Sequence, residues 1–279
     1  MDTIQSDTVV SPDGTTIEYN TVGQGPGLLI ISGGSRAAWH YLKLAEFLSP
    51  NYAVYLINRR GRGNSGAQGV DYSIRKEYED AIAIIKKHNI PYIFGHSYGG
   101  LIALYIALNY PLEKIAVFEP GVFTGNNIPL NWLPKFGKQL GKNDYTGAMI
   151  SMVKGLKMAS FLKYVPNPLL KIVFDLLSRK NPVWDKDKVL LSLLPKEIAA
   201  GLKTDQDISV YKKITFPVLL LGGVKSPKFL SDILNQLNRI IPQSSLHIMK
   251  GMNHNTPDEF GPELTAEALK GFFVNIDQP

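Results

Sequence analysis

One serine stands where its hydroxyl could act as a nucleophile. Residues 90–100 read IPYIFGHSYGG, so Gly95 and Gly99 lie two positions either side of Ser97, and an apolar helical stretch follows. A serine hydroxyl attacks a carbonyl only when a base takes its proton and the backbone holds it out of the helix. Glycines at these two positions permit the sharp strand-to-helix turn that does so. The spacing predicts that Ser97 is a nucleophile on such a turn.

Apolar runs predict the strands that must position this turn. They are continuous, which is typical of parallel strands buried on both faces, and they cover residues 28–31, 53–57, 92–94, 115–118 and 218–221. A turn at residues 11–14 predicts an N-terminal hairpin. Stretches with helical periodicity lie between these runs, at residues 39–48, 72–88, 98–109, 227–240 and 257–273. This alternation predicts an α/β protein with a doubly wound, mostly parallel sheet.

One segment, residues 121–215, breaks the alternation. It has no strand-like run, it is rich in Trp, Phe, Tyr and Met, and six prolines divide it into short helical pieces. We interpret it as a helical insertion that covers one end of the sheet, and we call it the cap. The predicted domains are therefore a core of residues 1–120 and 216–279 and a cap of residues 121–215.

Composition excludes several classes of function. The 279 residues are 44% hydrophobic and 19% charged, as expected for a globular enzyme, and the absence of cysteine excludes disulfides and thiolate chemistry. The net charge of +6 is spread over the chain without a nucleic-acid-binding motif. No apolar run is long enough to span a bilayer, and no secretory signal is apparent. We expect a cytoplasmic protein with a small-molecule substrate and no nucleic acid, membrane, metal or cofactor partner; the oligomeric state stays open.

The order of these parts resembles the α/β-hydrolase fold superfamily over nearly the whole chain. The matching parts are the turn at Ser97, the SGGS loop at residues 32–35, the NRRGRGNS turn at 58–65, the cap and the GMNH sequence at 251–254. The resemblance implies an α/β-hydrolase fold whose helical cap is inserted between strands 6 and 7. It also implies a serine hydrolase with a nucleophile, an acid and a histidine in this order along the chain.

That order implies that His254 is the base. It follows residues 244–249, which read as the last strand, and a neutral imidazole can take and return the Ser97 proton. The other histidines read as structural. We expect His247 within the strand, His88 as a cation at a helix end, His96 packed or hydrogen-bonded beside the turn, and His40 near the pocket.

The acid departs from the common pattern of the family. Many members have an aspartate after the seventh strand, but residues 221–227, LGGVKSP, contain no carboxylate. Glu119 ends the sixth strand, which resembles the acid position of haloalkane dehalogenases and pancreatic lipases. A carboxylate that closes an apolar strand needs a partner, so we predict that Glu119 orients His254. Other possible acids are Asp205, Asp207 and Asp232, whereas Asp258 lies too close in sequence to His254.

Backbone amides are the expected oxyanion donors. The resemblance implies the amide of Tyr98 at the start of a helix and that of Gly34 or Ser35 in the SGGS loop. We expect the arginines of the NRRGRGNS turn to make structural hydrogen bonds, because no phosphate-binding glycine and lysine pattern accompanies them: Arg59, Arg60 and Arg62.

The predicted reaction is hydrolysis of a small or medium hydrophobic ester through an acyl-enzyme. The sequence leaves thioesters, lactones, amides and activated carbon–carbon bonds open. One alternative is a non-catalytic ligand-binding or signalling protein on the same fold. Another is a cofactor-free haloperoxidase or acyltransferase that uses the same serine.

Overall fold

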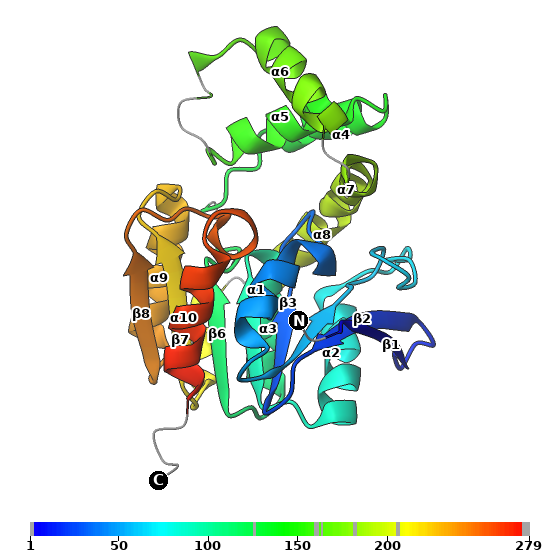
Figure 1. Ribbon diagram of the computed structural model, residues 1–279. Helices are drawn as coiled ribbons and strands as arrows, with labels where there is room; N and C mark the ends of the chain where they lie inside the picture. Colours follow the sequence, from blue (N-terminus) through cyan, green and yellow to red (C-terminus); the bar gives the residue numbers. More distant parts are fainter. Residues whose placement is uncertain are drawn as a thin grey trace.

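The computed structural model describes residues 3–124, 127–158, 162, 164–180, 183–204 and 207–274. Its centre is an eight-stranded sheet in the order β1-β2-β4-β3-β5-β6-β7-β8 (Figure 1). The strands are β1 Gln5–Val10, β2 Thr16–Val22, β3 Gly27–Ile31, β4 Ala53–Ile57, β5 Tyr92–His96, β6 Lys114–Phe118, β7 Val218–Gly223 and β8 Ser244–Met249. β2 pairs antiparallel with β1 and β4, and the other pairs are parallel. The sheet is therefore mostly parallel, as predicted.

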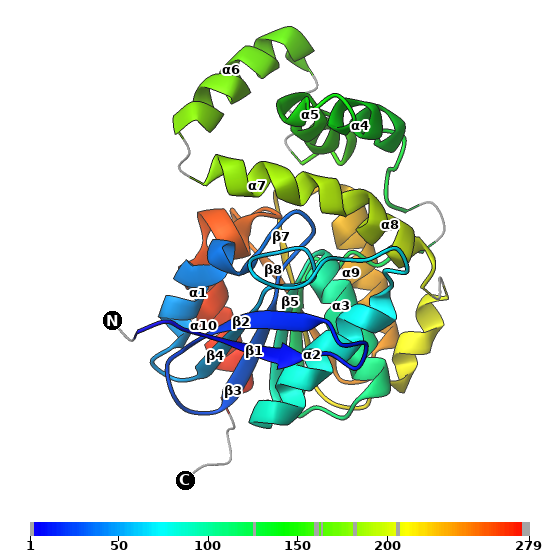
Figure 2. The ribbon, with the colours of Figure 1, turned by 90° about the vertical axis from the view of Figure 1, so that its right-hand side faces the viewer.

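Helices cover both faces of the sheet because consecutive strand residues point in opposite directions. Leu28 and Ile30 share a buried cluster with residues of α1 Leu42–Leu48 and α10 Pro262–Phe273. Leu29 and Ile31 share the other cluster with residues of α2 Ile74–His88, α3 Tyr98–Asn109 and α9 Lys228–Ile240. Figures 1 and 2 show these two helical layers. Each continuous apolar strand thus contributes side chains to the buried clusters on both faces of the sheet.

Two predicted helices are each divided in the structure. The stretch at 39–48 begins with a 3-10 turn, η1 Ala38–Tyr41, before α1. The stretch at 257–273 consists of a π-helical turn, η5 Thr256–Phe260, and then α10. Gly261 separates them, and Pro262 begins α10, where its missing N–H removes no helical hydrogen bond.

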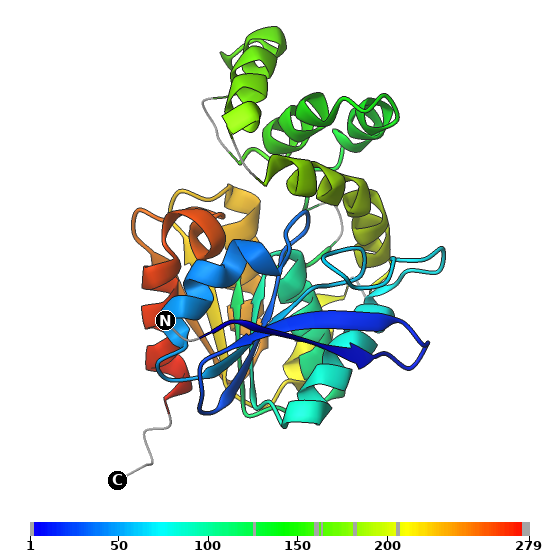
Figure 3. The same cartoon turned by 45° about the vertical axis from the view of Figure 1, so that its right-hand side comes forward.

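Five α-helices lie between β6 and β7 along the chain, among the described residues of the predicted cap. They are α4 Leu133–Leu140, α5 Tyr145–Gly155, α6 Asn167–Lys180, α7 Trp184–Leu190 and α8 Leu194–Leu202. Figure 3 shows them over one end of the sheet, with α6 outermost. α8 packs on the core through Leu194 and Ile198, and η4 Ile208–Lys213 packs against α9 and α3. In the described part of the chain, no helix is both long enough and apolar enough to cross a membrane.

Candidate active site

Ser97 occupies a strained turn between β5 and α3. Its backbone has φ of 54° and ψ of −117°, a conformation that a residue with a side chain rarely adopts. The two neighbouring glycines are required by close backbone approach. A Cβ on Gly99 would lie 2.1 Å from the Ile31 carbonyl oxygen, and a Cβ on Gly95 would lie 2.4 Å from the Gly99 carbonyl oxygen. The glycine spacing noted in the sequence therefore has a steric cause.

Glu119 and His254 meet although 135 residues separate them. His254 Nδ1 lies 2.7 Å from Glu119 Oε2, and the Glu119 side chain is 1% exposed. Glu119 follows β6 with φ of 45°, and its Oε1 accepts the Gly223 N–H at 2.7 Å. Burial raises the pKa of Glu119, but the His254 ring and the Gly223 N–H outweigh it and hold this pKa below its usual value. The ionised carboxylate accepts from Nδ1–H, which leaves His254 Nε2 as a proton acceptor.

His96 holds the backbone of His254 beside the Ser97 turn. His96 Nε2 donates to the His254 carbonyl oxygen at 2.8 Å, and the two ring centroids are 4.8 Å apart. Because Nε2 is the donor, Nδ1 accepts from the Tyr41 hydroxyl at 2.6 Å, and this hydroxyl oxygen accepts the Gly33 N–H at 3.2 Å. Burial, together with His254, lowers the pKa of His96 to about 4, which keeps the ring neutral. The predicted hydrogen-bonding role of His96 is confirmed.

The Ser97 hydroxyl has no hydrogen-bond partner among the described residues. Within the described part of the chain it makes no hydrogen bond, with His254 or with any other residue. Contacts between a nucleophile and its base are often long without substrate and tighten when substrate binds. The neighbouring His96 ring contacts the His254 ring, which places His254 at the same edge of the sheet as Ser97.

The loop after β3 supplies an unused amide next to Ser97. A Cβ on Gly33 would lie 3.3 Å from Ser97 Cβ, so this loop and the turn are neighbours. The Gly33 N–H donates to the Tyr41 hydroxyl oxygen, whereas the Gly34 N–H has no acceptor among the described residues. Tyr98 is the first residue of α3, and the helix itself does not use its first amides.

Buried ion pairs tie this loop to the cap. Arg59 Nη2 donates to the Gly33 carbonyl oxygen at 2.9 Å and to Glu197 Oε1 of α8 at 2.8 Å, and Arg62 also binds Glu197. Arg59 Nη1 donates to Glu77 at 3.0 Å. Burial alone would raise the pKa of Glu197, but Arg59 and Arg62 hold it below its usual value. Because Arg60 in turn binds Asp13 and Asp80, the predicted structural role of the three arginines is confirmed.

The other carboxylates considered as the acid have different partners. Asp232 binds Lys228 on the surface, and Asp207 caps η4. Asp258 binds Arg36, which also contacts Glu259. Asp205 lies outside the described residues.

The remaining histidines also lie away from the Ser97 turn or have other partners. His40 Nε2 lies 3.2 Å from Asp187 of α7, and His247 is exposed on β8. His88 ends α2, as predicted, but its surroundings disfavour the cation. Burial and the neighbouring Lys87 lower its pKa, and its ring hydrogen-bonds to Tyr19.

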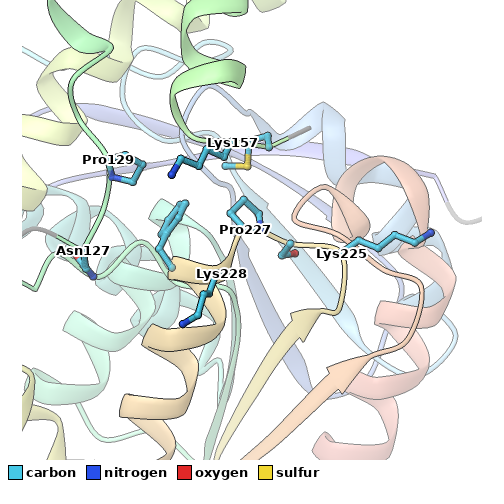
Figure 4. A pocket seen from close by; sticks show the side chains of 9 residues that line it. Asn127, Pro129, Lys157, Lys225, Pro227 and Lys228 are labelled. Carbon is cyan, nitrogen blue, oxygen red and sulfur yellow. The ribbon is translucent and has the colours of Figure 1, made fainter. Parts of the chain in front are cut away.

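A cavity of about 550 Å³ lies between the cap and the core (Figure 4). Its walls come from the segment after β6, from the residues after α5, from the loop between β7 and α9 and from the start of α9: Asn127, Pro129, Lys157, Met158, Lys225, Ser226, Pro227, Lys228 and Phe229. The loop from β7 begins at Gly223, whose N–H binds Glu119. No group of three His, Cys, Asp or Glu side chains within the described ranges could hold a metal ion.

Two positions that matter to this geometry escaped sequence reasoning, Tyr41 and Glu197. Glu197 had a readable signal, because it shares a helical face with Leu194, Ile198 and Gly201, which are apolar or small. A carboxylate on such a face requires a cation, and the arginine-rich turn at 58–65 offers three. Tyr41 had no such signal, because a tyrosine beside an apolar helix is ordinary.

Comparison with known proteins agrees with this architecture. The model of the Alpha/beta hydrolase family matches residues 28–268. The chain is similar to 2-(acetamidomethylene)succinate hydrolase of Mesorhizobium japonicum, with 24% identity over 92% of this chain and 91% of that protein. It is also 34% identical to the uncharacterized hydrolase YraK of Bacillus subtilis, over only 42% of this chain and 44% of that protein. An α/β hydrolase from Sphaerobacter thermophilus has a similar structure, with a TM-score of 0.78, 26% identity and coverage of 96% of this chain and 100% of that chain.

The chain belongs to the alpha/beta hydrolase family of enzymes. Its relatives and structural neighbours are named as hydrolases and esterases. The predicted fold class is thereby confirmed, with a mostly parallel sheet and flanking helices.

Proposed function

We propose that this protein is a serine hydrolase that cleaves small or medium hydrophobic esters through an acyl-enzyme. Ser97 is the nucleophile, His254 the general base and Glu119 the acid. The single observation that carries the proposal is the 2.7 Å contact between the buried Glu119 carboxylate and His254 Nδ1, beside a serine in a strained turn. It supports the proposal because it directs the free Nε2 of His254 to proton transfer.

In the proposed reaction, Ser97 Oγ attacks the ester carbonyl carbon and His254 Nε2 takes the hydroxyl proton. The carbonyl oxygen becomes an anion, which the amides of Gly34 and Tyr98 stabilise. The carbon–oxygen bond then breaks, and the imidazolium gives its proton to the leaving alkoxide. Water attacks the acyl-enzyme with His254 again as base, and the carboxylic acid leaves as the proton returns to Ser97.

The size of the cavity supports a small-molecule substrate. Its volume of about 550 Å³ lies within the range of small-molecule sites, about 300 to 1,000 Å³. Its lining is mixed, with Pro129, Met158, Pro227 and Phe229 as apolar residues and Lys157, Lys225 and Lys228 as cations. One relative of this chain is named 2-(acetamidomethylene)succinate hydrolase, and another is named pimeloyl-[acyl-carrier protein] methyl ester esterase.

A panel of p-nitrophenyl esters with native protein and Ser97→Ala tests the proposal. We expect turnover by the native protein and a loss of at least about a thousandfold in the variant, because no other group replaces the nucleophile. Ser231→Ala, on the surface of α9, should retain native turnover. A fluorophosphonate probe should label the peptide that contains Ser97. Turnover in both native protein and Ser97→Ala, or in neither, contradicts the proposal and favours the ligand-binding alternative in the second case.

A further inference from the structure

The outermost helix of the cap exposes an apolar face. Five aliphatic side chains of α6 recur at helical spacing and are 42 to 61% exposed: Leu169, Ile172, Val173, Leu176 and Leu177. Positions that differ by three, four, seven and eight residues lie on one side of a helix. They form one stripe rather than scattered surface residues, and monomeric proteins seldom leave such stripes uncovered.

The adjoining side of α6 already has its partner in the structure. Leu170 is 4% exposed and clusters with Ile150 of α5, and Phe174 packs against the same cluster. The helix is therefore held to the cap along one edge of the aliphatic stripe, and the five side chains of the stripe stay exposed beyond that edge. In all three views α6 lies at the outer end of the cap, and α7 and α8 lie nearer the sheet (Figures 1, 2 and 3).

Charge distinguishes this end of the molecule from the rest. Residues 121–215 contain 15 Lys and Arg against 7 Asp and Glu, whereas the remaining residues contain 15 against 17. All of the net positive charge of the chain thus comes from the cap. On α6 itself, the exposed Arg179 and Lys180 end the helix beside the aliphatic stripe. Apolar side chains flanked by cations suit a lipid surface, where anionic headgroups cover the apolar acyl chains.

We propose, in contrast to the expectation from the sequence of no membrane partner, that the aliphatic stripe of α6 docks on an anionic lipid surface. The stripe enters the boundary between headgroups and acyl chains, and the cationic cap is attracted by the anionic headgroups. A second copy of this chain fits the charge less well, because two positively charged caps would meet. The contact is peripheral, and it does not depend on the proposed function, because no catalytic residue takes part.

Co-sedimentation with lipid vesicles tests the proposal. We expect the native protein to bind vesicles of phosphatidylcholine mixed with phosphatidylglycerol about tenfold or more tightly than vesicles of phosphatidylcholine alone. Binding to the mixed vesicles should weaken as salt is added, because salt screens the attraction. Ser97→Ala protein should bind like the native protein, which separates this outcome from the test of catalysis.

Paired variants locate the contact. Leu176→Asp should weaken binding to the mixed vesicles by about tenfold or more, because it removes buried apolar area and adds a negative charge. Val70→Asp makes the same charge change at a fully exposed apolar residue on the surface of the core domain, outside the cap. This variant should bind like the native protein. Leu176 is 54% exposed, so an unchanged melting temperature is expected and checks the fold of the variant.

Several outcomes would overturn the proposal. One is no binding of the native protein to the mixed vesicles, and another is equal binding to both kinds of vesicle. Equal loss in Leu176→Asp and Val70→Asp would mean that net charge, and not α6, governs binding. A native dimer that Leu176→Asp dissociates, without vesicle binding, would assign the stripe to a second copy of the chain.

Discussion

Glu119 gives the first prediction at the scale of single residues. Glu119→Gln keeps the size of the side chain but removes the charge that supports an imidazolium and the acceptor that fixes the His254 tautomer. We expect kcat for a p-nitrophenyl ester to fall by about 100-fold to 10,000-fold with a small change in KM. Steady-state kinetics measure both constants.

The matched control is Asp232→Asn, which neutralises an acid that binds Lys228 on the surface of α9. It should keep kcat within about twofold of the native value, since it only loses an exposed ion pair. Near-native turnover in Glu119→Gln would assign the role of the acid to another carboxylate.

His96 gives a prediction on stability against pH. Its pKa is about 4 in the folded protein, whereas an unfolded chain titrates near its ordinary value of about 6.5. Between these values the unfolded chain binds a proton that the folded protein does not. The free energy of unfolding should therefore fall as pH is lowered from about 6.5 to about 4, with a contribution from this residue of up to about 1.4 kcal/mol per pH unit.

Urea unfolding of His96→Gln at pH 7 and pH 5 checks this expectation. The variant should lose stability less steeply than the native protein over this interval. His247→Gln removes an exposed histidine and should keep the native slope. His88 also has a lowered pKa, but it is present in all three proteins and cancels from the comparison. Identical slopes for His96→Gln and native protein would contradict the assignment.

At the scale of elements, Glu197 joins α8 of the cap to the loop after β3. Glu197→Gln leaves Arg59 and Arg62 buried with less compensating charge, while the shape of the side chain is kept. Breaking a buried ion pair in this way costs about 3 to 5 kcal/mol. We expect a loss of this size in the free energy of unfolding, measured with urea at pH 7, and a lower kcat because Arg59 also holds the Gly33 carbonyl.

Glu267→Gln is the control for that experiment. Glu267 is exposed on α10, so its replacement should change stability by less than about 0.5 kcal/mol. If Glu197→Gln were equally mild, the ion pairs between α8 and the turn after β4 would contribute little net stability. The cap would then be held to the core by apolar contacts such as those of Leu194 and Ile198.

At the scale of the whole molecule, the cap and the core should differ in local stability. α3 has nine buried residues, seven of them in the main core cluster, whereas α6 buries Leu170 alone, in a small separate cluster. Regions with few buried contacts open locally at lower cost. We expect amides of α6 to exchange with deuterium at least about a hundredfold faster than those of α3, as measured by mass spectrometry. Equal protection of the two helices would show that cap and core open as one unit.

The core of the sheet could be predicted from the sequence because its signals are local. Continuous apolar runs at residues 28–31 and 115–118 required burial on both sides, and the structure places them inside a mostly parallel sheet. Element ends were harder to predict. The 3-10 turn before α1 and the π-helical turn before Gly261 pack against each other, and helical periodicity does not report that packing.

The sequence by itself predicted that Ser97 stands on a sharp strand-to-helix turn, because Gly95 and Gly99 flank it and Gly95 closely approaches the Gly99 carbonyl within the same turn; the close approach of Gly99 to the Ile31 carbonyl of β3 arises only in the tertiary structure. The sequence also indicated that Glu119 needs a partner, since a carboxylate at the end of an apolar strand is costly without one. Only the tertiary structure decided which partner each buried charge has. Glu119 lies 135 residues from His254, and Arg59 lies 138 residues from Glu197. Periodicity indicates which side of a helix or strand is buried. The element that packs against that side is determined only when the whole chain folds.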